Sequence, residues 1–436
     1  MELSVRRQFS SEPSAPVAPA VILEDPRIRW RNIVIVAAAF VAFFLKLAIA
    51  YNTFGTNDVV TFYMFARSLA DHGLEWTYQN GFVWFSNFPV FNHPPLTAYY
   101  LQFIGYISHQ EFFRSCGLTF PFLLRLPGII ADLVVVIILM RLQQVDDRLR
   151  IPSWALALFA ISPVSVMISG FHGNTDPIVV MFLVLAAYAC LLTRPVLCGI
   201  SFALSCQVKV IPLLFLPIIF FYWLERDAAK RFATPFVLLS LTMCAEPLIR
   251  CPTLLLKNVL GYGGFWGGWG ISYCLSLTDW PQFSGTGFFK LPPAAVAVSF
   301  LLKLTIVAAV FLLAWRRRQL PGRAVIDSIA YAWIVFFVFA PGVCPQYMVW
   351  LAPFVLLLSP KLYAWLTAAS SIALFFLYNA LSGGLPWYIG IARNSAHGES
   401  HLLPWELLPW ITLIVGMTAF WSNAFVTRSS MREQLP

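Results

Sequence analysis

The chain has 436 residues, of which 59% are hydrophobic, 16% are aromatic and only 11% are charged, and its net charge is +9. A soluble fold could not bury so much apolar surface, and the basic residues are spread between apolar runs instead of forming a nucleic-acid-binding patch. The composition therefore predicts an all-α polytopic membrane protein that lies in a lipid bilayer and has no nucleic-acid partner.

The chain begins with a Ser-, Pro- and Ala-rich stretch flanked by arginines, without a small-residue cleavage site. This pattern predicts a cytoplasmic N-terminal tail over residues 1–32 instead of a cleaved signal peptide. We expect one transmembrane domain over residues 33–426 and a cytoplasmic C-terminal tail over residues 427–436.

Apolar runs recur along the transmembrane domain, and a helix of about 20 residues crosses a hydrocarbon core of about 30 Å. The runs predict about twelve transmembrane helices, at residues 33–50, 125–142, 152–169, 177–193, 196–209, 211–224, 232–248, 294–315, 325–341, 347–359, 362–379 and 405–424.

Basic residues orient these helices, because cytoplasmic loops carry an excess of Lys and Arg. With the twelve spans above, the basic loops fall on one side, which we assign to the cytoplasm: Arg141, Arg148, Arg150, Arg226, Lys230, Arg231, Arg316 to Arg318 and Arg323.

The apolar stretch from Pro94 to Ile107 is short and opens with two prolines, so we expect an interfacial helix instead of a further crossing. Residues 51–124 then form a long first outer loop with juxtamembrane helices, and residues 249–293 form a second outer loop rich in Gly and Trp. Long loops in compact proteins are usually functional.

Polar residues gather in the outer segments. Asp58 follows the first span and opens an amphipathic segment, Val59 to His72, so it is either a helix N-cap or a functional acid. Asp176 borders two apolar runs, where an ionised group is costly. Lys209 separates two short apolar helices, and it either serves a site or snorkels to the surface.

Two further ionisable residues lie inside the predicted spans. Lys46 is in the outer half of the first span and Asp132 is inside the second. They are either functional or simply paired with each other. In the second outer loop, the Gly-rich segment 261–270 carries Trp266 and Trp269, which are either a candidate lid that stacks on a sugar or part of the interfacial aromatic belt.

The order of these features resembles that of the GT-C superfamily of membrane glycosyltransferases, which use polyprenyl-phosphate-linked sugars. The shared features are an acid after the first span, a Pro-Pro-Leu segment, Arg125-Leu126-Pro127, an acid in the next outer loop and a Lys-x-x-Pro at Lys209 to Pro212. Segments 94–99 and 172–176 are similar to those of dolichol-phosphate-glucose-dependent enzymes, and Cys344-Pro345-Gln346-Tyr347 resembles a motif of dolichol-phosphate-mannose-dependent ones.

The resemblance implies an inverting hexosyltransferase that moves a hexose from a polyprenyl-phosphate sugar to a lipid-linked or polymeric glycan acceptor at the outer membrane face. Asp58 would be the catalytic base and Asp176 a second catalytic acid that orients the acceptor or the sugar. The donor phosphate or sugar would be bound by Lys209, with help from His93, His172, Arg250, Gln346 and Tyr347.

The sequence departs from the superfamily where His93 replaces the acid that commonly precedes Pro-Pro, and it lacks an acid-rich metal cluster. We therefore expect no metal site and no cofactor, with a requirement for a divalent metal left open. A membrane transporter or a flippase of lipid-linked sugars is the alternative function. The short loops favour a bacterial inner membrane, with the endoplasmic reticulum membrane as the second candidate.

Overall fold

The structure is a computed structural model that describes residues 26–82, 91–146, 149–261, 266–278, 280, 291–384 and 404–424. It is 83% helical, and the described residues contain no strand. The predicted terminal tails lie largely outside the described residues.

Six helical segments are long and apolar enough to cross a membrane, and each coincides with a predicted span. They are α1 (Pro26–Asn52), α5 (Phe120–Val145), the segment made of α6 (Ser153–Ala160), α7 (Pro163–Ser165) and η2 (Val166–His172), α11 (Ala229–Arg250), α14 (Pro293–Arg317) and α17 (Pro360–Ser382). The chain is therefore an all-helical polytopic membrane protein.

The other six predicted spans correspond to shorter helices, so the number of twelve crossings stays a prediction. These helices are α8 (Asp176–Leu191), α9 (Pro195–Val208), η3 (Ile211–Phe215) with α10 (Leu216–Leu224), α15 (Arg323–Phe339), η5 (Pro345–Val349) with α16 (Ala352–Leu358), and η6 (Pro404–Glu406) with α18 (Leu407–Ala424).

Proline begins many of these helices, including α9, α14 and α17. Its fixed φ suits the first helical turn, and its missing N–H is not needed there. Proline also separates short helices that would otherwise merge, which explains why several apolar runs fold as pieces of about 14 residues or fewer.

α9 and α10 are the two arms of a short hairpin. The hydroxyl of Tyr222, near the end of α10, donates to the carbonyl of Cys190, just before α9, at 3.0 Å. The start of α9 and the end of α10 thus lie at one end of the bundle, and the tip of the hairpin at Lys209 points toward the other. The tip is largely covered, since the side chain of Lys209 is only 11% exposed.

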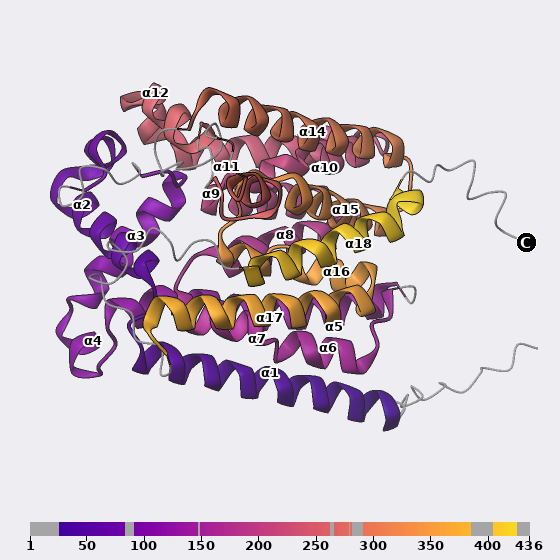
Figure 1. The fold of residues 1–436 in the computed structure, drawn as a ribbon, viewed down its shortest axis with the longest axis horizontal. Coiled ribbons are helices and arrows are strands. Elements are labelled where there is room, and N and C mark those ends of the chain that lie inside the picture. The colour runs from indigo at the N-terminus through magenta and orange to yellow at the C-terminus, as the bar shows by residue number, and fades with distance from the viewer. Residues whose placement is uncertain are drawn as a thin grey trace, which may run out of the picture.

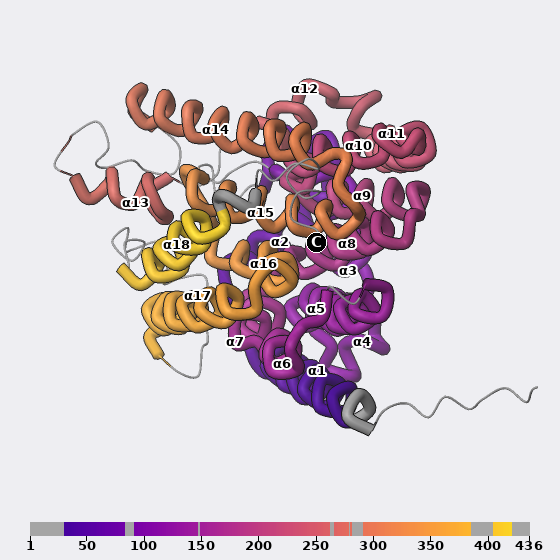
Figure 2. Tube along the Cα trace, turned by 90° about the vertical axis from the view of Figure 1, so that its right-hand side faces the viewer, coloured from indigo at the N-terminus to yellow at the C-terminus, as the bar shows by residue number. Residues whose placement is uncertain are grey.

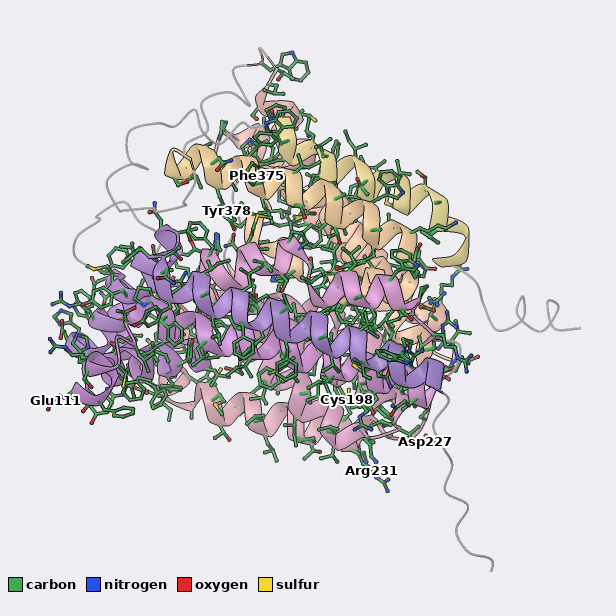
Figure 3. All side chains as sticks on the ribbon, turned by 90° about the horizontal axis from the view of Figure 1, so that it is seen from below. Glu111, Cys198, Asp227, Arg231, Phe375 and Tyr378 are labelled. Atoms are coloured by element: carbon green, nitrogen blue, oxygen red, sulfur yellow. The ribbon has the colours of Figure 1, made fainter. Side chains whose placement is uncertain are left out.

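Most of the remaining helices gather at one end of the bundle. They are α2 (Asn57–Asn80), α3 (Pro95–Ser108), α4 (Glu111–Ser115), α12 (Pro252–Leu255) and η4 (Leu256–Leu260), whereas α13 (Gly270–Ser276) packs against α15. In Figure 1, α2, α3, α4 and α12 lie together at the left. Figure 3 shows Glu111 at this end and Asp227 and Arg231 at the opposite end.

Two hydrophobic cores support this arrangement. The larger one joins α5, α8, α15 and α16 inside the bundle, and nearly every side chain of α15 is buried. The smaller one lies under α2 and α3 and includes Phe62, Phe65 and Leu69, which confirms the apolar face predicted for segment 59–72. α1, α11 and α14 expose large apolar side chains, as expected of helices in lipid.

Candidate functional site

A polar cluster lies where α2 begins, where η2 meets α8, at the tip of the α9–α10 hairpin and in η5. We define it by six residues: Asp58, His172, Asn174, Asp176, Lys209 and Gln346. All six belong to segments that the sequence predicted to be functional, and the structure brings them together across as many as 288 residues of chain.

Asp58 is the centre of the first half of the cluster. Its Oδ2 accepts hydrogen bonds from Asn174 Nδ2 at 2.6 Å and from Gln346 Nε2 at 3.2 Å, and it lies 3.1 Å from His172 Nε2. The N-cap of α2 is Thr56, whose hydroxyl accepts from the N–H of Asp58 at 3.3 Å. Because Thr56 caps the helix, the Asp58 carboxylate is available to the site.

The charge state of Asp58 follows from these neighbours. Burial by itself would raise the pKa of the Asp58 carboxyl, but the nearby His172, Lys209 and Asn174 together lower it below its ordinary value. The carboxylate is therefore ionised near neutral pH. Its side chain is 36% exposed, whereas that of His172 is 8% exposed, so Asp58 is the member of this pair that reaches solvent.

His172 is held from both sides of its ring. Nδ1 lies 2.9 Å from the hydroxyl of Tyr378 on α17, and Nε2 faces Asp58. Since an ionised Asp58 can only accept, Nε2 carries a proton and donates to it, and Tyr378 holds the other ring nitrogen in place. The backbone is fixed as well, because Thr56 Oγ1 donates to the carbonyl of His172 at 2.8 Å.

Asp176 and Lys209 form the second half of the cluster. Lys209 Nζ lies 2.7 Å from Asp176 Oδ1, and the indole of Trp350 donates to the same oxygen at 2.5 Å. Asp176 is fully buried and Lys209 is 11% exposed. Lys209 also lies 5.1 Å from the ring centre of Tyr347, which stacks on Trp350. The two charges thus neutralise each other inside an aromatic pocket.

His93 and its neighbours support the hairpin tip. The carbonyl of His93 accepts from the hydroxyl of Tyr78 at 2.8 Å, and Thr97 Oγ1 donates to the carbonyl of Val208 at 2.8 Å. Burial lowers the pKa of His93 to about 3, and the charge of Lys209 acts in the same direction. His93 is therefore a neutral side chain beside the cluster, packed against Phe62.

Arg125 holds the segments that carry the cluster. It is 1% exposed, and its guanidinium donates to the carbonyls of Ala50 and Thr53 at the end of α1 and of Gly170 and Phe171 in η2. These carbonyls belong to the last turns of two helices, which have no intrahelical donor. Arg125 thereby fixes the chain just before Asp58 and just before His172.

The structure places three predicted site residues away from the cluster. Arg250 is exposed at the end of α11. Trp269 is buried and donates from its indole to the carbonyl of Phe337 at 2.6 Å, and Trp266 is buried against Ala295. Residues 262–265 of the predicted lid lie outside the described residues.

Sequence reasoning missed several contributors. Asn174 and Arg125 stood inside quoted motifs but had no assigned role, although a buried arginine beside a helix end is a recognisable signal. Tyr378 lies within the apolar helix α17 and Trp350 lies between η5 and α16, and their position in the sequence carries no polar signal. In the described ranges, no three His, Cys, Asp or Glu side chains are grouped so that they could hold a metal ion.

Comparison with known proteins decides the family. The family model described as PIG-U, a GPI transamidase subunit, matches residues 33–278, which is more than half of the chain. The chain belongs to the PIG-U family. No curated protein matches it. The matched region contains every member of the polar cluster except Gln346, which lies in the C-terminal part of the bundle.

This membership overturns the predicted function. The prediction of a glycosyltransferase that uses a polyprenyl-phosphate sugar is wrong, as are the predicted sugar donor, the glycan acceptor and the alternative of a transporter or flippase, because the PIG-U family consists of GPI transamidase subunits. The prediction of a bacterial inner membrane is not supported either.

The motifs shared with GT-C proteins explain why the function was predicted wrongly. PIG-U proteins are distantly related to GT-C fold proteins, so the order of motifs reflects a common fold and not a common reaction. In this chain, Arg125 binds backbone carbonyls and Lys209 binds Asp176. These motif residues therefore hold the helices together, whatever chemistry related folds perform.

Proposed function

We propose that the chain is a non-catalytic subunit of a GPI transamidase in the endoplasmic reticulum membrane, and that its polar cluster binds the polar head of the GPI anchor precursor. The family supports the first part, since a PIG-U protein works with other subunits and with this glycolipid. The position of the cluster supports the second, because the head group of a glycolipid lies at the end of a membrane bundle.

The main support for this proposal is that the Asp58 carboxylate is ionised, oriented and partly exposed. Three side chains orient one of its oxygens, and the group remains 36% exposed and ionised. A fixed carboxylate of this kind accepts hydrogen bonds from sugar hydroxyls or from an ammonium group. The head of a GPI precursor offers both kinds of donor.

The charges of the cluster also favour a ligand that is rich in hydrogen-bond donors. Asp176 and Lys209 neutralise each other, and Asp58 leaves one negative charge beside a neutral His93. Among the buried side-chain oxygens without a hydrogen-bond partner in the described structure are Asn57 Oδ1, next to Asp58, and Asp176 Oδ2. A ligand rich in donors would satisfy such groups, whereas a phosphate would be repelled.

Replacing Asp58 by Asn tests the proposal, because the amide keeps the size of the side chain but loses its charge. We expect Asp58→Asn to lower the amount of GPI precursor that co-purifies with the transamidase about tenfold, as the loss of a charged hydrogen bond predicts. Mass spectrometry of the purified complex measures the bound glycolipid.

Asp71→Asn is the matched control, since Asp71 is an exposed acid on the same helix. It should leave the bound glycolipid unchanged. If the complex with Asp58→Asn assembles normally and retains GPI at the level of the control, the head group binds elsewhere.

A further inference from the structure

Lys303 is an exposed lysine in the middle of a membrane-spanning helix. It lies on α14 in a row of side chains with Val296, Phe300 and Val307, each of which is more than half exposed. The spacing of four, three and four residues places the row along one side of the helix. Figures 1 and 2 show α14 at the edge of the bundle.

Lys303 lies far from both ends of α14, which disfavours lipid head groups as its partner. Ten residues separate it from Pro293 and fourteen from Arg317, which correspond to about 15 Å and about 21 Å along the helix axis. The four-carbon stem of a lysine spans less than half of either distance, so snorkelling leaves the ammonium within the hydrocarbon layer. Phosphate groups of lipids do not reach this depth.

Two other lysines of the bundle pair with carboxylates. Lys46 Nζ lies 2.6 Å from Asp132 and Lys209 Nζ lies 2.7 Å from Asp176. In the part of the chain that the structure describes, Lys303 has neither an ion pair nor a hydrogen bond from its side chain. An unpaired charge at this depth is costly, so a carboxylate from another chain completes the pattern.

We propose that the row Val296, Phe300, Lys303 and Val307 docks a transmembrane helix of a partner subunit, and that this helix carries an Asp or Glu that pairs with Lys303. The three apolar side chains pack against the partner helix, and the ion pair sets its depth and rotation. Polar contacts between membrane helices specify partners in this way. The proposal is independent of head-group binding by the polar cluster.

Photo-crosslinking from α14 tests the docking directly. A photoreactive phenylalanine analogue is placed at Val307, or at Leu301, which is 60% exposed on another side of the helix and lies about 9 Å away along the axis. We expect Val307 to give a covalent adduct with another subunit in native membranes, and Leu301 to give none. Equal yields of protein adduct from the two positions would refute the docking surface.

Charge variants test the ion pair. We expect Lys303→Met to reduce co-purification of the crosslinked subunit about tenfold and Lys303→Arg to preserve it, since arginine keeps the charge. An unchanged midpoint of thermal unfolding in detergent shows that the Lys303→Met chain folds. Full association of Lys303→Met, or a crosslinked helix without an acidic residue in its membrane span, would overturn the inference.

Discussion

Arg125 shows how one residue can order a site that it does not enter. Its guanidinium is buried, and its acceptors in the described structure are backbone carbonyls and the hydroxyl of Thr53 instead of a carboxylate. Carbonyls at helix ends carry partial negative charge, so several of them together compensate a cation. Two such ends converge on Arg125, and each leads directly into a segment of the polar cluster.

Replacing Arg125 by Met should therefore destabilise the protein by about 3 kcal/mol or more, because several buried carbonyls lose their donor at once. Thermal unfolding in detergent, followed by tryptophan fluorescence, measures the effect. Arg114→Met is the control, since Arg114 is exposed on α4, and it should shift the midpoint little. A similar midpoint for the two variants would mean that water or relaxed backbone replaces the guanidinium.

At the scale of elements, the turn between η2 and α8 decides the geometry of the cluster. Gly173 has φ +81°, and a β-carbon there would overlap with Val59 of α2. Only glycine fits such a left-handed position at a close contact. The turn directs His172 and Asn174 toward Asp58, and two residues later Asp176 opens α8 facing the hairpin tip.

We expect Gly173→Ala to displace α2 from this turn and to abolish retention of GPI. Gly73→Ala is the matched control, because Gly73 has φ +82° but no atom within 4 Å of the position that a β-carbon would take. Both variants strain the backbone, by about 1–3 kcal/mol, and only the first disturbs the site. Equal retention of GPI by the two variants would show that the contact with Val59 does not position the cluster.

At the scale of the whole molecule, the bundle has two chemically different ends. One carries α2, α3, α4 and the polar cluster, and the other carries the basic loops, including Arg226, whose guanidinium binds the carbonyls of Arg318 and Leu320. The positive-inside rule predicts that the basic end faces the cytoplasm and that the polar cluster faces the opposite compartment.

Cysteine labelling should place Glu111→Cys and Asp227→Cys on opposite sides of the membrane, as their positions in Figure 3 predict. The experiment uses a chain in which the exposed cysteines, Cys116 and Cys274, are replaced by Ser. Asp227→Cys should react from the cytoplasmic side. Labelling of both positions from the same side would contradict the orientation of the bundle.

The sequence by itself determined the class of protein and the position of its main helices. Apolar runs and prolines act locally, since a backbone in lipid must satisfy its hydrogen bonds within the helix. The sequence also offered pairing as one of two interpretations of Lys46 and Asp132. The structure shows this pairing, because the two side chains lie 2.6 Å apart and both hydrogen-bond to Ser165.

Tertiary structure alone decided what the polar residues do. Pairing of Lys209 with Asp176 and recruitment of Tyr378 to His172 depend on contacts between segments far apart in the chain. No local pattern encodes which of several polar side chains meet, because packing of the whole bundle selects the pairs. For the same reason, motifs shared with GT-C enzymes predicted a fold correctly in outline and a reaction wrongly.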